Sequence, residues 1–350
     1  MVLNRRMSFK ERRAVRFGRA ARHKPFVSLC VPVYGTEELI GRFFESVLQQ
    51  ADAAPLFETI VVNDGSPGAK ELRGIIKTYT KRFKERGLPL VFLEHSKNLG
   101  TLEARRTAVN ATSGEYLAFA DPDDELPPNA LRLLYDAAAT SGADIVHGKA
   151  AVCGMEGEPD TRVAAFSQRA QNVYDGVLTG DEILRTYIVE HLYSSFVWGK
   201  LFKTDLVQKA YGEIPFTYCT MAEDMLLYFF ITLTASEAAG VLGDDHTEKP
   251  CIYIGIRDVV YHYRINTGVT SRREITDLAA WQKVCSAASV FTIILSYLDE
   301  HPAVDGGIRE AIQDLGRAHY ADNLKQLEVC VVPSLQREAR AMLDDWWGAL

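Results

Sequence analysis

Residues 116–125 read YLAFADPDDE, a short apolar run followed at once by a cluster of acids. Residues 116–120 (YLAFA) have the composition of a buried β-strand. The carboxylates after it are Asp121, Asp123, Asp124 and Glu125. Turn and capping chemistry accounts for one or two aspartates at such a place, whereas a tight cluster of like charges is repulsive. A divalent cation, Mg²⁺ or Mn²⁺, with substrate phosphates completing its coordination, would compensate them.

The sequence around this stretch alternates between strand and helix patterns. We expect strands at residues 26–33, 57–63, 88–93, 116–120 and 144–152, and helices at residues 39–50, 70–86, 99–111 and 129–140. Strands separated by helices of this length indicate βαβ units and a mainly parallel sheet, which is the α/β class. Ligands of such sheets bind beyond the carboxyl ends of the strands. The residues that follow each strand are therefore candidates for a site.

Polar residues follow each of the first three strands as well. They read YGTEE at 34–38, DGSPG at 64–68 and HSKN at 95–98. The glycine-rich signatures of other nucleotide-binding proteins are missing from the sequence, because no G-x-G-x-x-G follows the first strand and no G-x-x-x-x-G-K-[ST] occurs. A dinucleotide site of the Rossmann type and a P-loop are therefore unsupported.

Several segments, in this order, resemble the family 2 glycosyltransferases, which have the GT-A fold. They are PVYGTEELIGRFFESVLQQ (32–50), FETIVVNDGSPG (57–68), SKNLGTLEARRTAVNATSGEYLAFADPDDEL (96–126), SFVWGKLFKTDLV (195–207), AEDMLLYFF (222–230) and VVYHYRINTGVTS (259–271). The resemblance covers about residues 26–272. It implies an inverting, metal-dependent enzyme that uses a nucleotide sugar, often a uridine-linked one.

The resemblance implies a nucleotide-binding role for five residues. Pro32, Tyr34 and Glu38 would border the base and ribose. Asp64 would bind the edge of the base, and Arg105 would lie near the nucleotide.

The resemblance also assigns the metal and the proton transfer. Asp121 and Asp123 would form the D-x-D pair, with Asp123 the more direct ligand of the cation, and Asp224 would be the catalytic base with Glu223 as its fallback. A metal ion offsets the charge that develops on a leaving diphosphate. A positioned carboxylate takes the proton of the acceptor hydroxyl. One such attack on the anomeric carbon inverts its configuration.

Other residues keep two interpretations. Asp224 also suits the first turn of the apolar helix that follows it. His262 is either a packed strand residue or a late ligand of the metal. Arg264 either binds the diphosphate or is solvated. Trp198 and Lys200 resemble a block near the acceptor cleft, although a core position suits the tryptophan equally well.

The 350 residues are 47% apolar and 24% charged, as in ordinary soluble globular proteins. Residues 1–24 hold nine basic residues and one acid, a charge of +8, which leaves −15 on the remainder of a chain with a total of −7. An acidic body argues against a nucleic-acid partner. We divide the chain into a basic arm (1–25), a GT-A domain (26–272) and a C-terminal helical region (273–350), with helices at 277–298, 308–327 and 335–350.

The expected location is the cytoplasm. Six cysteines without metal or redox spacing indicate a reducing compartment. No signal peptide is recognised, and the apolar stretches fall short of the roughly 18 residues of a membrane span. The basic arm and the C-terminal helices leave open a peripheral contact with the inner face of the cell membrane, and the helices also leave open a homodimer.

We therefore expect an inverting, Mn²⁺- or Mg²⁺-dependent glycosyltransferase. It would move a sugar from a UDP-linked donor to a hydroxyl of a glycan or lipid-linked acceptor, in surface polysaccharide synthesis. A sugar-1-phosphate nucleotidyltransferase remains an alternative, although it would usually show a basic glycine-rich loop where residues 34–38 are acidic. The second alternative is a non-catalytic nucleotide- or glycan-binding module. The intact Asp121, Asp123 and Asp224 argue against this alternative.

Overall fold

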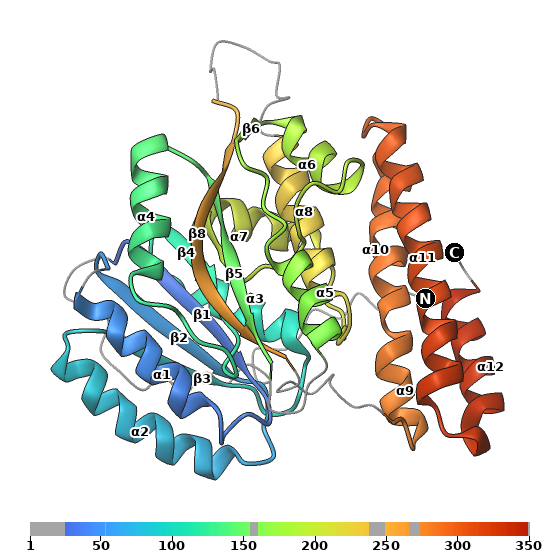
Figure 1. The fold of residues 1–350 in the computed structure, drawn as a ribbon, viewed down its shortest axis with the longest axis horizontal. Helices are drawn as coiled ribbons and strands as arrows, with labels where there is room; N and C mark the ends of the chain where they lie inside the picture. The colour runs from blue at the N-terminus through green and yellow to red at the C-terminus, as the bar shows by residue number, and fades with distance from the viewer. Residues whose placement is uncertain (1–24, 53, 155–159, 238–248, 266–273, 349–350) are drawn as a thin grey trace.

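The computed structural model describes residues 25–52, 54–154, 160–237, 249–265 and 274–348 (Figure 1). The basic arm at residues 1–24 lies outside the described residues, and so do Arg272 and Arg273, two further arginines whose chemistry suits a diphosphate. A twisted sheet forms the centre of the molecule, and helices cover both of its faces. A further group of helices stands to one side, at the right of Figure 1.

The sheet has the strand order β3-β2-β1-β4-β7-β5-β8-β6. In chain order the strands are β1 (Val27–Val33), β2 (Phe57–Asn63), β3 (Leu90–Glu94), β4 (Tyr116–Phe119), β5 (Ile145–Cys153), β6 (Val177–Thr179), β7 (Lys200–Lys203) and β8 (Ile252–Arg264). The first four strands in the sheet order are parallel, as are β5 and β8. Only β7 and β6 run antiparallel to their neighbours among the described strands. The expectation of a mainly parallel α/β sheet is confirmed.

Helices of the first half lie on opposite faces of this sheet. They are α1 (Ile40–Gln49), α2 (Ala69–Glu85), α3 (Thr101–Ala111) and α4 (Ala130–Ser141). Side chains of β1 alternate between the faces, so that Val31 packs in one buried cluster with α1, α2 and α4 while Cys30 packs in the other with α3. Each of the nine elements predicted between residues 26 and 152 is present, with ends within two residues of the prediction.

The second half adds elements that the sequence analysis did not foresee. They are α5 (Asp160–Ala170), β6, α6 (Asp181–Ile188), β7 and α7 (Thr204–Glu213). The apolar helix predicted at residues 225–233 is the middle of α8 (Glu223–Glu237), and every residue from 225 to 233 is buried. Because no side of this segment faces solvent, α8 is a core helix and its first turn is held firmly in place.

The C-terminal helical unit consists of four helices. They are α9 (Leu278–Cys285), α10 (Ala287–Glu300), α11 (Gly306–Cys330) and α12 (Gln336–Trp347). The helix expected at residues 277–298 is present as α9 and α10, which follow each other directly with the one turn residue Ser286 between them. The hydroxyl of Ser286 donates a hydrogen bond to the carbonyl of Lys283 at 2.6 Å, and such local bonds compete with the helical pattern.

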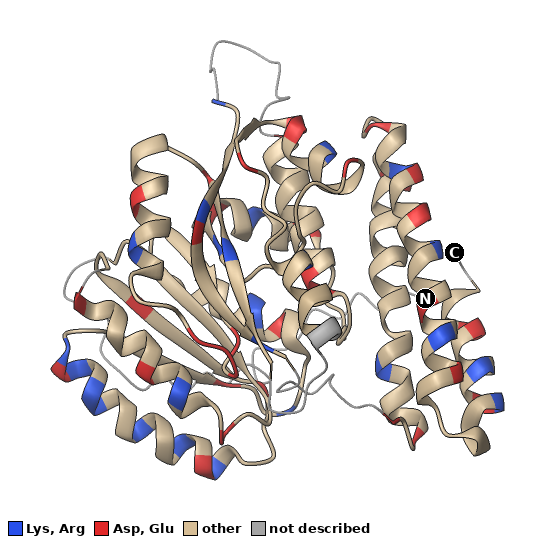
Figure 2. Cartoon of the chain, viewed as in Figure 1, with Lys and Arg blue, Asp and Glu red and all other residues tan. Residues whose placement is uncertain are grey.

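Charged residues gather on the outer surfaces, above all on α2 and on the C-terminal helices (Figure 2). The stretch Leu278–Glu300, which joins α9 and α10, is the one described helical segment long and apolar enough to cross a membrane by length and composition. This stretch is longer than the apolar stretches of fewer than about 18 residues expected from the sequence, because α9 and α10 follow each other directly. In the structure 44% of its most apolar window is buried inside the molecule.

Candidate active site

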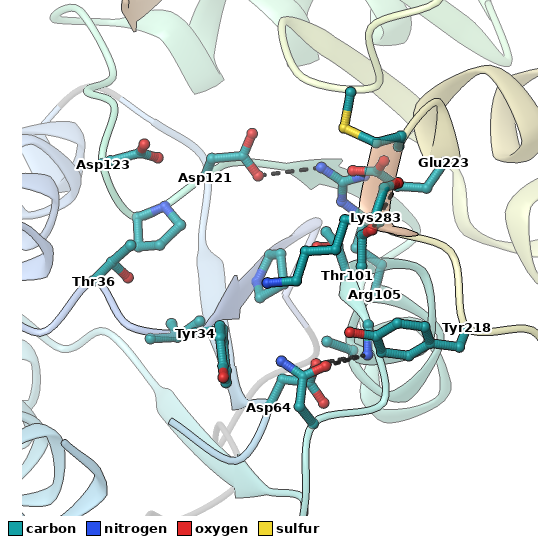
Figure 3. Close-up of a pocket in the computed structure, with 18 of the residues that line it drawn as sticks. Tyr34, Thr36, Asp64, Thr101, Arg105, Asp121, Asp123, Tyr218, Glu223 and Lys283 are labelled. Atoms are coloured by element: carbon teal, nitrogen blue, oxygen red, sulfur yellow. Dashed lines mark hydrogen bonds and ion pairs between the residues drawn. The ribbon is translucent and has the colours of Figure 1, made fainter. Parts of the chain in front are cut away.

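A cavity of about 320 Å³ opens at the carboxyl ends of β1, β2 and β4 (Figure 3). The loop before α8 and the helix α9 close its other side. Its polar lining consists of Tyr34, Thr36, Asp64, Asn98, Thr101, Arg105, Asp121, Asp123, Tyr218, Thr220, Glu223, Tyr263, Lys283 and Gln326. We call this cavity the donor pocket. Its position agrees with the rule that open α/β sheets bind ligands beyond the carboxyl ends of their strands.

Arg105 connects the acidic residues of this site. Its side chain comes from α3 and is 2% exposed. The guanidinium forms ion pairs with Asp121, at 3.2 Å, and with Asp224, and lies 3.8 Å from Glu223. Asp121 directly follows β4, whereas Glu223 and Asp224 begin α8. One buried cation therefore links the two acidic motifs, which are about a hundred residues apart in the chain.

Burial and mutual repulsion alter the acidity of these groups. Burial raises the pKa of Asp121 to about 6, against the opposing effect of Arg105. Burial and then the charge of Asp224 raise the pKa of Glu223 to about 7. Burial lowers the pKa of Arg105, but Asp224 and the other carboxylates outweigh it and raise that pKa overall. The site thus carries more negative charge than one guanidinium compensates, as expected of a place that receives a cation.

Asp64 holds the loop between β3 and α3. Its carboxylate accepts hydrogen bonds from the amides of Leu99, at 2.9 Å, and Gly100, at 2.8 Å, and His95 Nδ1 lies 2.7 Å away. The structure therefore places Asp64 at the bottom of the donor pocket, already bound to backbone groups. Oδ1 contacts both the Leu99 amide and His95, whereas Oδ2 accepts from Gly100 and has a second lone pair, so contact of Oδ2 with a base stays compatible with this arrangement.

The acidic cluster after β4 divides into two functions. Asp121 and Asp123 line the donor pocket. Asp124 is buried and accepts hydrogen bonds from the Tyr261 hydroxyl, at 2.9 Å, and from the amide of Arg264, at 2.7 Å. Burial raises its pKa well above the ordinary range. A cation is therefore not needed to explain all four carboxylates, since Asp124 serves the fold.

Arg264 lies outside the donor pocket. Its guanidinium pairs with Glu125, with Nε 2.9 Å from Oε1, and Arg42 pairs with the same carboxylate at 2.8 Å. The backbone of His262 exchanges hydrogen bonds with Glu125 at 2.9 and 3.1 Å, which pins β8 to the segment after β4. The structure thus separates Arg264 from the pocket that the sequence analysis assigned to it.

The residues present fit a cation that binds together with a phosphate substrate. Among the described residues no group of three or more His, Cys, Asp and Glu side chains could hold a metal ion, so His262 does not complete such a group. Asp121 and Asp123 nevertheless both line the pocket. Mg²⁺ characteristically binds through one or two carboxylates, with waters and phosphate oxygens as its other ligands.

The segment after β1 supplies further polar groups. Pro32 and Tyr34 line the donor pocket as expected, whereas Glu38 does not. Thr36, which the sequence analysis passed over although it lies between them, also lines it. The hydroxyl of Thr36 is buried and has no hydrogen-bond partner. An unpartnered buried hydroxyl at a cavity is a group that a ligand can satisfy.

Trp198 and Lys200 are buried next to the segment that contacts Asp224. The Trp198 ring is buried and stacks on Phe196 and Tyr261, with ring centres 4.3 and 4.9 Å apart. Lys200 is fully buried, and its ammonium group donates to the carbonyls of Ser194, at 3.0 Å, and Phe196. Burial lowers the pKa of Lys200 well below its ordinary value.

These contacts shape the loop next to Asp224. The amide of Val197, between Phe196 and Trp198, donates to the Asp224 carboxylate at 3.3 Å. Trp198 and Lys200 thus hold the backbone that orients Asp224. Their burial makes the core interpretation of Trp198 the one that the structure supports.

The fold is that of the GT-A glycosyltransferases. A fragment of TarS from S. aureus, solved with UDP-GlcNAc, superposes with a TM-score of 0.51 at 17% identity, over 92% of this chain and 89% of the fragment. A mannosyltransferase from Pyrobaculum calidifontis, solved with GDP-Man and Mn²⁺, gives a TM-score of 0.50 at 15% identity, over 93% and 84% of the two chains.

Sequence comparison identifies the family. The model of glycosyl transferase family 2 matches residues 28–222, so the chain belongs to that family. It is 27% identical over 203 residues to the poly(ribitol-phosphate) beta-N-acetylglucosaminyltransferase TarP of Staphylococcus aureus, which covers 57% of this chain and 55% of the relative. It is 29% identical over 183 residues to YibD of Escherichia coli, an uncharacterised glycosyltransferase, over 52% and 50% of the two chains. The chain spans about half the length of these curated relatives.

Proposed function

We propose that the protein transfers a sugar, with inversion, from a UDP-linked donor to a hydroxyl of a glycan or lipid-linked acceptor, with Mn²⁺ or Mg²⁺ bound. One observation carries this proposal: a single pocket is lined by Asp121, Asp123 and Glu223, and Arg105 in its wall pairs both with Asp121 and with Asp224 at the start of α8. The choice of UDP is supported by the solved complex of TarS with UDP-GlcNAc. The choice of a polymeric acceptor is supported by the named activity of TarP on poly(ribitol-phosphate).

In this proposal the segment after β1 binds the nucleoside. Pro32, Tyr34 and Thr36 line that part of the donor pocket, with Asp64 below them. The Thr36 hydroxyl, which has no hydrogen-bond partner within the protein, would gain one from the nucleoside. Burial and a satisfied hydrogen bond together stabilise the bound nucleoside.

Asp123 and Asp121 would hold the metal, which when bound supplies positive charge to the leaving diphosphate. Asp224 acts as the general base. Arg105 and the amide of Val197 fix its carboxylate, which receives the proton of the acceptor hydroxyl as the hydroxyl oxygen bonds to the anomeric carbon. The bond from that carbon to the donor phosphate breaks in the same step, and the nucleoside diphosphate leaves with its electron pair. Glu223 beside it is the fallback base.

The experiment that tests this proposal measures thermal stability with UDP, GDP and CDP, each with and without Mn²⁺. Metal-dependent stabilisation by UDP alone is the expected result, because a ligand that binds the native state raises the melting temperature. Release of UDP from UDP-sugars is then measured with candidate acceptors. Absence of any response to all three nucleotides would overturn the proposal, and tight binding without turnover would indicate a binding module.

We also propose that the enzyme works in the cytoplasm against the inner face of the membrane. Two features support this: the +8 charge of residues 1–24 and the apolar stretch Leu278–Glu300. Basic segments bind anionic lipid surfaces in a salt-dependent way. Cosedimentation of the protein with phosphatidylglycerol vesicles, compared with phosphatidylcholine vesicles, tests this point, and equal recovery with both would contradict it.

A further inference from the structure

One wall of the donor pocket comes from the C-terminal helical unit. Ala280, Lys283 and Val284 of α9 line the pocket together with Gln326 and Cys330 of α11. Residues spaced three and four apart share one face of a helix, so the three α9 residues form a continuous surface toward the pocket. Figure 3 shows the side chain of Lys283 extending from α9 into the pocket.

The position of α9 is fixed by contacts on its other sides. Trp281 is fully buried, and its indole Nε1 donates to the carbonyl of Ala339 in α12 at 2.8 Å. Asp277 caps the helix by accepting a hydrogen bond from the amide of Ala280 at 2.8 Å. A helix anchored in this way holds the base of the Lys283 side chain in place, while its four methylenes leave the ammonium group freedom to adjust.

The same helix contacts the loop that leads to the acid pair. The hydroxyl of Thr220 lies 3.3 Å from the hydroxyl of Ser286, at the end of α9. Glu223 begins α8 three residues after Thr220. The end of α9 is therefore in contact with the segment that carries the proposed catalytic residues.

Lys283 is one of two basic residues in the donor pocket. The acidic residues that line the pocket are Asp64, Asp121, Asp123 and Glu223, and the basic ones are Arg105 and Lys283. Arg105 is committed to the buried carboxylates described above. Lys283 forms no ion pair with any residue that the structure describes, and its ammonium group is thus available to an anionic ligand.

We propose that Lys283 binds the diphosphate of the nucleotide donor, so that the C-terminal helical unit completes the donor site. The inference rests on the proposed function, since it presumes a nucleoside diphosphate in this pocket. A diphosphate brings several negative charges to a lining that is already acidic. A lysine ammonium is a compact cation with three donors and is a common ligand of phosphate. This assignment replaces Arg264, whose guanidinium is held by Glu125.

The test compares the binding of UDP with that of uridine, each in the presence of Mn²⁺, by calorimetry. In Lys283→Met the dissociation constant for UDP rises about five- to tenfold, as for loss of one charge-assisted hydrogen bond at a solvated site, while that for uridine changes less than about twofold. Lys283→Arg keeps most of the affinity for UDP. Lys325→Met removes a lysine of α11 that is 76% exposed, and this matched control binds both ligands as the wild type does.

Each outcome decides between the two claims. If wild type and Lys283→Met bind UDP equally, the inference falls while the proposed function stands. If the wild type binds UDP no better than uridine, the proposed function falls with it. A parallel loss of UDP and uridine binding in Lys283→Met, with Lys283→Arg equally impaired, would also overturn the inference, because the contact would then serve the shape of α9 rather than the diphosphate.

Discussion

Replacement of Glu223 by Gln should stabilise the protein at neutral and alkaline pH. The carboxyl group is largely buried, with 18% of the side chain exposed, and lies beside Asp224, and both effects oppose its ionisation. Arg105 offsets them only in part, since its guanidinium lies 3.8 Å from Glu223 but contacts Asp224 directly. An ionised Glu223 is therefore a destabilising feature of the folded state, which an uncharged amide of nearly the same shape avoids.

The size and the pH range of this effect follow from the pKa. Folding raises the pKa of Glu223 from 4.5 to about 7, which corresponds to about 3 kcal/mol of folding free energy. Below pH 4.5 the group is protonated in both states, and the favourable contribution of the protonated form is fully present. This contribution is lost as the pH rises toward 7. The gain in free energy of unfolding of Glu223→Gln over wild type should therefore be near zero at pH 4.5. It should grow as the pH rises from 4.5 to 7 and level off above pH 7.

Urea denaturation of both proteins at intervals between pH 4.5 and 8.5 measures this difference. The matched control is Glu85→Gln, which removes an exposed carboxylate of α2, 62% accessible, and should give no pH-dependent gain. A difference between Glu223→Gln and wild type that stays constant across the interval would refute the reasoning. A variant that is less stable than wild type at pH 8 would refute it as well, because Glu223 would then be stabilised as an anion.

Four further substitutions test the site and the fold. Asp224→Asn should lower the rate of sugar transfer about 10²- to 10⁴-fold, the usual contribution of a general base, while the dissociation constant of UDP with Mn²⁺ changes less than about twofold. Transfer assays measure the first effect and calorimetry the second. An active variant would exclude Asp224 as the base. Asp123→Asn should remove most of the Mn²⁺-dependent rise in melting temperature with UDP and leave the metal-free response unchanged; an undiminished response would remove Asp123 from the metal site. Arg105→Met leaves buried carboxylates without their cation. It should lower the free energy of unfolding by about 3–5 kcal/mol at pH 7 and by less at pH 5, as measured by urea denaturation. A loss of stability that is independent of pH would contradict this account. Gly65→Ala should cost about 2 kcal/mol, because Gly65 has φ +70° and an added Cβ would lie 2.6 Å from the carbonyl carbon of Lys97; an unchanged melting temperature would show that this turn can relax.

The parallel half of the fold could be predicted because its signals are local. Strands such as residues 57–63 are rich in apolar β-branched residues and buried on both faces, and the helices between them show clear periodicity. Short antiparallel elements gave no such signal. β6 and β7 have three and four residues, and their pairing with β8 and β4 depends on distant parts of the chain.

The candidate site was predictable where a residue follows a strand directly. Asp121, Asp123 and Asp64 were found in this way, and all three line the donor pocket. Tyr218 and Lys283 could not be found, because their place in the pocket results from tertiary packing of a loop and of α9. No pattern in the sequence around either residue distinguishes it from a solvated surface residue.

Two assignments show how partners decide the role of a charged side chain. Arg264 has the chemistry of a phosphate ligand, yet Glu125 lies within reach and binds it instead. Asp124 belongs by sequence to the acidic cluster after β4, yet it faces Tyr261 and stabilises the end of β8. Sequence spacing gives neither partner, since both come from strands that pair only in the folded protein.

The complete burial of residues 225–233 in α8 has a consequence for how such an enzyme can be re-engineered. The acid pair starts a helix that cannot move without disturbing the centre of the molecule. The wall facing it belongs to α9 and α11, which follow β8 as a consecutive block at the end of the described chain. The acid pair and the wall formed by α9 and α11 therefore belong to distinct blocks of the chain. A chimera that exchanges only the block after β8 with that of a relative would retain the proton-transfer apparatus and inherit a different rim around the donor.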